Sequence, residues 1–257
     1  MRKIISVLTL LLFISCSSDE VSFQFEAVVN TPKVVLDKPF TITVSMKEQI
    51  AGLKYSFDNF ATHLATYTSG SYGTSQDLHF RFSTIGKKTI YIRLIKDGNI
   101  ESETKVITVD VERGESVRIT GLKINSFDGI NTVWDPEHDK SNPNSLADVS
   151  FYFSKVGYYN AFSSNGTIEP FYQTSVKENQ GNLTWSFLNE NLYIDPQGYF
   201  IFNIFDQDGP NLVQTLANSV NVPHIYMSQY ASTKPSSIIV NFPESNSVEF
   251  ILYLEWP

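Results

Sequence analysis

Cysteine and positive charge are both scarce in this 257-residue chain. Only one residue is cysteine, so a framework of intramolecular disulfides is excluded and stability must come from packed hydrophobic cores. Lysine and arginine number 19 against 27 acidic residues, and the densest basic pair is Lys87 with Lys88. Because contacts to a phosphate backbone require a basic patch, we expect no nucleic acid partner.

Recognisable catalytic motifs are also missing. The four histidines lack His-x-x-x-His spacing, and the sequence has no Gly-x-Ser-x-Gly elbow and no phosphate-binding glycine motif. The densest polar cluster is Glu137, His138 and Asp139, but adjacent residues in a loop rarely aim at one point. We therefore expect a protein that is not an enzyme. Paired carboxylates of a glycoside hydrolase stay open as an alternative, because their separation is a three-dimensional property.

The single cysteine, Cys16, follows a segment typical of bacterial signal peptides. A positively charged start, an apolar run over residues 4–14 and the small residue Ser15 precede it, and the run is too short to span a bilayer. The segment LFISC at residues 12–16 resembles a lipobox. This resemblance implies removal of residues 1–15, acylation of Cys16 and a stable anchor of more than one acyl chain. An ordinary secretory signal with a chance cysteine is the alternative.

The mature chain that such cleavage would leave is acidic. Loss of Arg2 and Lys3 changes the formal net charge from -8 to -10. Residues 16–21 then form a short polar tether with the acidic pair Asp19 and Glu20. This tether resembles the acidic export signal of surface lipoproteins of Bacteroidota, which implies an outer-membrane protein on the periplasmic or the cell-surface face. A plain solvated linker is the alternative reading.

Alternation of apolar and polar residues with a period of two dominates the remaining sequence. It predicts half-buried strands over residues 40–46, 89–94 and 248–256, and a hairpin turn at Asp97-Gly98-Asn99. The nearly continuous apolar run at 199–205 predicts a central strand covered on both faces. No stretch combines helical periodicity with helix caps. The expected class is therefore all-β, with strands arranged as sandwiches.

The charged, glycine-containing turn at residues 112–115 is the best candidate for a domain boundary. We expect one β-sandwich domain over residues 22–113 and a second over residues 116–257. Each has enough alternating segments to build its own core, and the whole chain is long enough for two cores.

The first predicted domain has the size of an immunoglobulin-like sandwich, without the paired cysteines of antibody domains. Its segments LKYSFD at 53–58, FSTIGKKTIYIRL at 82–94 and KDG at 96–98 follow the order of a PKD-type module, which the domain resembles. A tryptophan and a Gly-Asp-Gly turn expected in that family are absent. The resemblance therefore implies the immunoglobulin-like fold more strongly than membership of the PKD family.

The second predicted domain contains WD at 134–135, then Asp148 before an apolar run, and later DQD at 206–208. This order, over about half of the chain, resembles a C2-like β-sandwich. In that family two acidic loops meet at one end of the sandwich and hold calcium, so the resemblance implies calcium ligands at Asp135, Asp148, Asp206 and Asp208. The family's further acidic residue after Asp-x-Asp is missing, which implies that calcium binding is weak or lost. An ordinary turn at 206–210 is the alternative.

Aromatic residues make up 14% of the chain, and most are expected in the cores. The pair Tyr158 and Tyr159 would point to opposite faces of a strand, so one of the two is a candidate ligand-binding residue.

The leading functional hypothesis is a non-catalytic, lipid-anchored envelope or cell-surface accessory protein with a protein or glycan partner and no cofactor other than calcium. One alternative is a surface glycan-binding lipoprotein of a nutrient uptake system, which predicts an exposed row of aromatics beside Asn, Gln or Asp. Another is a hydrolase without a recognisable motif, which requires a pocket with perturbed carboxylates.

Overall fold

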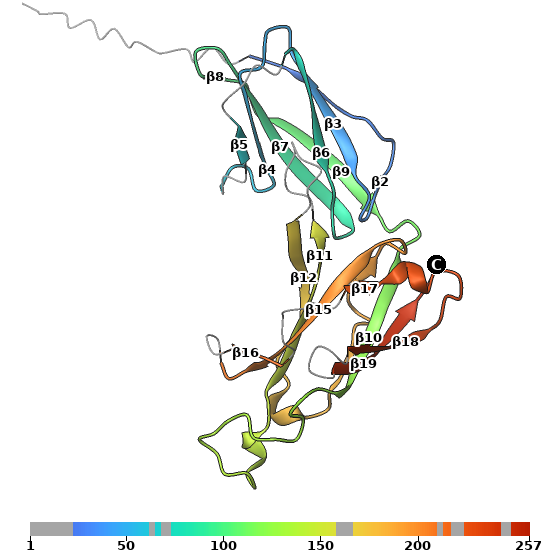
Figure 1. The fold of residues 1–257 in the computed structure, drawn as a ribbon. Helices are drawn as coiled ribbons and strands as arrows, with labels where there is room; N and C mark the ends of the chain where they lie inside the picture. The colour runs from blue at the N-terminus through green and yellow to red at the C-terminus, as the bar shows by residue number, and fades with distance from the viewer. Residues whose placement is uncertain are drawn as a thin grey trace, which may run out of the picture.

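The computed structural model describes residues 23–61, 65–67, 73–157, 167–209, 213–216, 224–242 and 248–257. In these ranges the chain forms β-strands and short 3-10 turns, and no α-helix is present (Figure 1). None of the helical turns in this part of the chain has the length and apolar character needed to cross a membrane. The predicted signal peptide, the lipidation site Cys16 and the pair Tyr158 and Tyr159 lie outside the described residues.

The first half of the chain forms two facing sheets. One contains three strands in the order β1-β3-β6, and the other has the order β2-β9-β7-β4-β5, with β8 paired to β7. All neighbours are antiparallel except β2 and β9. The strands are β1 (Glu26–Val29), β2 (Val34–Val35), β3 (Phe40–Ser45), β4 (Gly52–Ser56), β5 (Ala65–Tyr67), β6 (Ser75–Phe80), β7 (Gly86–Lys96), β8 (Ile100–Glu101) and β9 (Lys105–Glu112).

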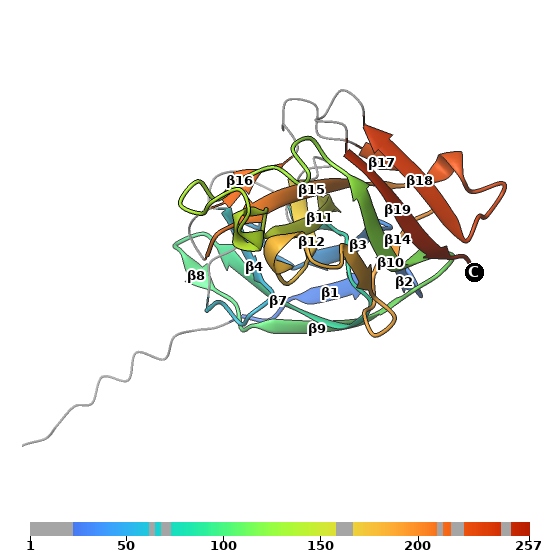
Figure 2. The same ribbon diagram turned by 90° about the horizontal axis from the view of Figure 1, so that it is seen from below.

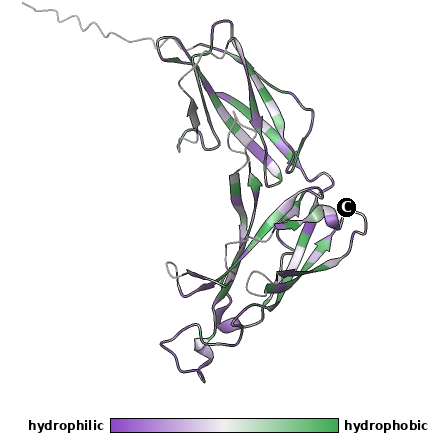
Figure 3. Ribbon diagram, in the orientation of Figure 1, coloured by the Kyte–Doolittle hydropathy of each residue, from purple (hydrophilic) through white to green (hydrophobic). Residues whose placement is uncertain are grey.

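The core of this first sandwich follows from the period-two pattern. Buried and half-buried residues alternate along β3, so that Ile42 and Val44 lie fully inside, and Ile92 of β7 belongs to the same core. Figure 3 shows the corresponding bands of hydrophobic and hydrophilic residues along the strands. The hairpin at Asp97-Gly98-Asn99 is confirmed, because Lys96 pairs with Ile100 across it and Gly98 and Asn99 take positive φ angles.

The second half also forms two sheets, which Figure 2 shows as separate layers. One has the order β13-β10-β19-β18, with β14 beside β10, and the other has the order β12-β11-β15-β16, with β17 also paired to β15. The strands are β10 (Val117–Ser126), β11 (Val149–Gly157), β12 (Thr167–Gln173), β13 (Thr184–Ser186), β14 (Tyr193–Ile194), β15 (Tyr199–Gln207), β16 (Val213–Thr215), β17 (His224–Tyr226), β18 (Ser237–Phe242) and β19 (Val248–Glu255). The expected class of all-β sandwiches is therefore confirmed.

Strand β15 is central, as the sequence predicts, but its outer face is not fully covered. Phe202 and its neighbours at alternate positions enter the core, where the Phe202 ring lies 4.4 Å from that of Phe250 in the opposite sheet. On the outer side Ile201 is buried, whereas Tyr199 and Phe205 remain half-buried. The prediction of cover on both faces is therefore wrong for part of the strand, because the apolar run includes rings that reach the surface.

The two sandwiches meet at a buried ion pair. The Nζ of Lys155 in β11 donates to Oδ2 of Asp37 at 2.9 Å, and both side chains are 2% exposed. The same Nζ donates to the carbonyl of Tyr193, whose ring packs against the first core. Burial lowers the pKa of Lys155 and raises the pKa of Asp37, while their mutual attraction opposes both shifts. A charge buried this deeply needs its partner, so the pair ties a residue of the first sandwich to one of the second.

Candidate functional site

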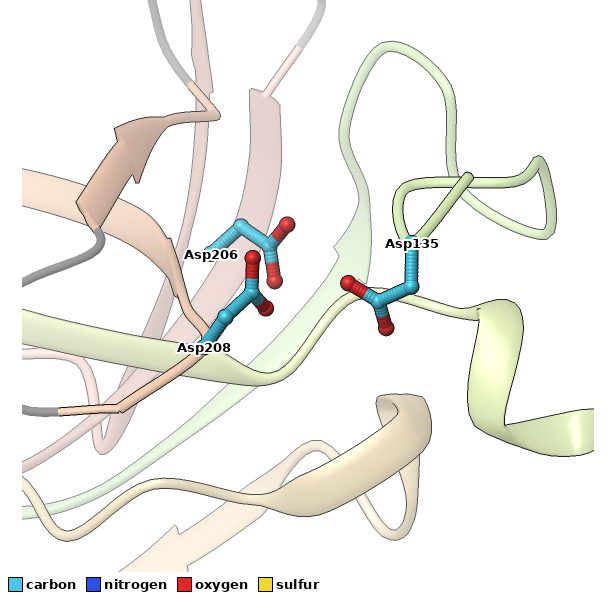
Figure 4. Close-up of side chains that lie close together, drawn as sticks. All are labelled: Asp135, Asp206 and Asp208. Carbon is cyan, nitrogen blue, oxygen red and sulfur yellow. The ribbon is translucent and has the colours of Figure 1, made fainter. Parts of the chain in front are cut away.

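Three of the four predicted acidic residues converge at one end of the second sandwich. One carboxylate oxygen from each of Asp135, Asp206 and Asp208 lies within 4.8 Å of the others. Asp206 lies at the end of β15, Asp208 directly follows that strand, and Asp135 comes from the long connection between β10 and β11. Figure 4 shows the carboxylates of Asp206 and Asp208 directed toward that of Asp135.

Trp134 anchors the loop that carries Asp135. Its indole packs against the second core, and its Nε1 donates to the carbonyl of Gly129 at 3.0 Å. The backbone N–H groups of Trp134 and Asp135 both donate to the carbonyl of Ser145, at 2.7 and 3.3 Å. The Trp-Asp pair therefore works as a unit, in which the half-buried ring holds the loop and the next residue presents its carboxylate.

Asp206 is the most deeply buried member of the cluster, with 0% of its surface exposed. Its Oδ1 accepts a hydrogen bond from the backbone N–H of Asp148 at 2.6 Å. Its Oδ2 has no hydrogen-bond partner among the described residues. A buried carboxylate oxygen without a partner costs free energy, and a cation beside Asp135 and Asp208 would satisfy it.

Burial and mutual repulsion disfavour the ionised form of the clustered carboxyl groups. The pKa of Asp206 is raised to about 6, chiefly by burial. The hydrogen bond from Asp148 lowers this pKa, and the charges of Asp208, Asp135 and Asp148 add to the rise. Burial is also the first cause that raises the pKa of Asp135 to about 6, followed by the charge of Asp208 and a hydrogen bond with it. A cation would offset this repulsion and lower the pKa of both carboxyl groups.

Asp148 has a different position from the other three. Its backbone N–H orients Asp206, its carbonyl accepts from the N–H of Gln207 at 2.9 Å, and its Oδ1 accepts from the N–H of Asn179 at 2.7 Å. It is not a member of the group within 4.8 Å. The structure thus assigns Asp148 contacts that hold the end of β15, and its predicted part as a ligand stays a prediction.

The residues present fit calcium better than a softer metal. The cluster offers carboxylate oxygens alone, with no histidine or cysteine in the group. Calcium takes six to eight oxygens in flexible geometry, so other loop oxygens and water would complete a shell begun by three carboxylates. Zinc sites, in contrast, commonly use nitrogen and sulfur.

A hollow of about 760 Å³ lies elsewhere, on the first sandwich, where Phe25, Met46 and Lys105 contribute to its lining. The carboxylates with clearly raised pKa values at the acidic cluster, Asp135 and Asp206, belong to the second sandwich and do not line it. This hollow and the perturbed carboxylates of the acidic cluster therefore lie in different sandwiches.

Sequence reasoning missed a group of rings on the outer face of the second sandwich. Tyr199 of β15 lies beside His224 and Tyr226 of β17, with ring centroids 4.8 and 5.4 Å away. The alternation of Tyr199, Ile201, Asn203 and Phe205 with core residues was a usable signal, because alternate residues of a strand share a face. Because the run is almost continuously apolar, it predicted a strand covered on both faces instead of one with an exposed row of rings.

Comparisons with known proteins do not assign this chain to a family. No protein-family model matches the chain, and no curated protein matches it in sequence. Among solved structures, the chain is similar to the fibronectin(III)-like modules of Clostridium thermocellum CbhA, at 10% sequence identity over 74% of this chain and 91% of that chain, with a TM-score of 0.25. The assignment of β-sandwiches rests on the strand pairing described above.

Proposed function

We propose that this chain is a non-catalytic, lipid-anchored accessory or interaction protein of the cell envelope, and that calcium organises the loops at the end of its second sandwich. The observation that carries the calcium part is the buried, unpaired Oδ2 of Asp206 beside the carboxylates of Asp135 and Asp208. The lipobox-like segment that ends at Cys16 supports the anchor and an outer-membrane position. The PKD-like and C2-like assignments of the two sandwiches belong to the same proposal.

The position of the cluster suits display to a partner. In β11, Val149 lies opposite Asp206, whereas Lys155, six residues later, contacts the first sandwich. Six residues of extended strand span about 20 Å, so the acidic cluster lies at the far end of the second sandwich from the junction. Figure 1 shows the connection between β10 and β11 at that end. A first domain next to the anchor would hold these loops away from the membrane.

Calcium would supply positive charge to three carboxylates that come from two separate segments. Asp135 is fixed through Trp134 to its own loop, and Asp206 is fixed through Asp148 to the sheet. An ion held between them would join the loop to the end of β15. The partner-binding shape of this end would then depend on calcium, in the weak affinity range of extracellular modules.

Calorimetric titration of the full chain with calcium tests the proposal. We expect saturable binding that is abolished by the double replacement Asp206→Asn and Asp208→Asn. Asp110→Asn, which neutralises an exposed aspartate on β9, is the matched control and should bind as the wild type does. Equal binding by the double variant and the wild type would contradict the assignment, as would the absence of binding at several millimolar calcium.

A further inference from the structure

The outer face of the sheet formed by β12, β11, β15 and β17 carries an ordered set of rings. In β15 the core-facing residues alternate with Tyr199, Asn203 and Phe205 on the outer side. Tyr199 pairs directly with Tyr226 across the β15–β17 ladder, and Tyr152 of β11 pairs with Asn203 on the other side. These residues therefore share one surface.

The rings form two groups. In the first, Tyr199 lies 4.8 Å from His224 and 5.4 Å from Tyr226, and the rings of His224 and Tyr226 are 6.0 Å apart with an interplanar angle of 27°. Tyr226 is 46% exposed, and His224 is also exposed. In the second group, Tyr152 and Phe205 stack at 5.1 Å with an angle of 21°.

Hydrogen-bonding side chains lie between and beside the two groups. Between Tyr199 and Phe205, β15 has two outer positions: Ile201, which is buried, and Asn203, which is half-buried. Gln173 of β12 lies opposite Tyr152, and Gln207 accepts a hydrogen bond from the Ser150 hydroxyl at 3.0 Å. Because Tyr199 and Phe205 are six residues apart in one strand, the rings and amides extend over about 20 Å.

This face carries no formal charge, although the protein is acidic. The outward positions of the four strands include no Asp, Glu, Lys or Arg; they are Ser150, Tyr152, Ser154, Val156, Ile168, Pro170, Gln173, Tyr199, Ile201, Asn203, Phe205, Gln207, His224 and Tyr226. Of these, Ser150, Ser154 and Ile201 are buried. The whole chain has a formal net charge of -8. A charge-free surface on such a protein suits a neutral ligand, because an anionic ligand would need basic partners and a cationic one acidic partners.

Rings and amides without charge match the chemistry of sugars. A pyranose ring presents C–H groups on its faces, which stack on aromatic rings, and hydroxyl groups on its edge, which bond to amides. We propose that this face, centred on Tyr199, His224 and Tyr226, binds a neutral polysaccharide. This proposal rests on the proposed function, because it takes the protein to bind a glycan without cleaving it. It adds the chemical class of the partner.

Cross-strand ring pairs can also serve stability alone, since aromatic neighbours strengthen a sheet. Such a role would be satisfied by buried rings, whereas Tyr226 keeps 46% of its surface in solvent. The two roles differ in what substitution does. Loss of a purely structural ring lowers the melting temperature and leaves ligand binding intact below it.

Affinity electrophoresis of the full chain tests the proposal. The native gels contain, in turn, a neutral glucan, a mannan, a xylan and, as the charged counterpart, polygalacturonate. We expect at least one neutral polysaccharide to retard the wild type. Tyr226→Ala and His224→Ala should each weaken that affinity about tenfold or more at a temperature where both variants are folded. Tyr253→Ala is the matched control, because Tyr253 is a 37% exposed tyrosine on β19 of the opposite sheet.

Failure of the glycan-binding face and failure of the proposed non-catalytic function give different experimental results. Retardation by none of the neutral polysaccharides, retardation by polygalacturonate alone, or unchanged affinity in both Tyr226→Ala and His224→Ala would overturn the glycan face. Release of reducing ends from a retarded polysaccharide would instead overturn the non-catalytic function and leave the binding face standing. Binding that survives in calcium-free buffer supports a face that works independently of the acidic cluster.

Discussion

Asp206→Asn should change the stability of the protein in opposite directions without and with calcium. Asparagine keeps the shape of the side chain and an oxygen that can accept the hydrogen bond from Asp148. It removes the charge that burial and Asp208 disfavour. In calcium-free buffer the variant should therefore be more stable than the wild type at pH 7.5, although an aspartate has been lost from a buried position.

The size of this effect follows from the pKa of Asp206, which burial raises from 3.8 to about 6. One pKa unit corresponds to about 1.4 kcal/mol, so the upper bound is about 3 kcal/mol at pH 7.5. The pKa of Asp206 is higher in the folded state than in the unfolded state. Its contribution to the free energy of unfolding of the wild type is therefore fully present below about pH 4 and is lost as the pH rises through 6. The difference between variant and wild type should therefore vanish at pH 4.

Calcium should reverse the order of stability. A ligand that binds only the folded state at a hundredfold excess over its dissociation constant stabilises by about 2.7 kcal/mol, and the variant should lose this gain. Urea denaturation followed by circular dichroism measures the free energy of unfolding of the wild type and the variant, each without and with calcium. Asp110→Asn is the control and should stay within about 0.5 kcal/mol of the wild type. Destabilisation of the calcium-free protein by Asp206→Asn at pH 7.5 would refute the reasoning, since it would show that the charge itself is satisfied.

Three further predictions concern the junction, the domains and the anchor. Lys155→Ala should lower the free energy of unfolding by about 3–5 kcal/mol in urea titrations, because it leaves Asp37 buried without its partner, and an effect below about 1 kcal/mol would contradict the buried pair. Fragments 22–113 and 116–257 should each fold alone, and the absence of dispersed NMR spectra from both would show that the boundary is wrong. Cys16→Ala should release the protein from membranes, and equal amounts of mutant and wild type in the membrane fraction would disprove the anchor.

Local periodicity was enough to predict the strands whose two faces differ. The alternation in β3 and β19 marks one buried side, and the glycine-containing turn after β7 closes a hairpin whose register the sequence implies. The convergence of Asp135 with Asp206 and Asp208 was predictable only through the resemblance to C2-like sandwiches. Nothing in the spacing of these residues indicates their separation in space.

Features that depend on pairing between distant segments could not be predicted. Asp37 and Lys155 are 118 positions apart, and each alone reads as an ordinary surface charge. Tyr199 meets His224 only because β17 pairs with one end of β15 in a particular register. Asp148 matched the pattern of a ligand, but its contacts with Asp206 and Asn179 depend on how the strand end and the adjoining loop pack.

Terbium luminescence tests the central claim most directly. Terbium occupies oxygen-lined calcium sites and emits when a nearby indole transfers energy to it, and Trp134 immediately precedes Asp135 in the anchored loop. We expect sensitised emission from the wild type under tryptophan excitation. Calcium should displace the terbium, and the emission should be lost in Trp134→Phe and in the double variant Asp206→Asn and Asp208→Asn. Trp185→Phe, which changes a core tryptophan, should keep the emission. Absence of sensitised emission from the wild type, or its persistence in the double aspartate variant, would contradict a metal site at this end of the second sandwich.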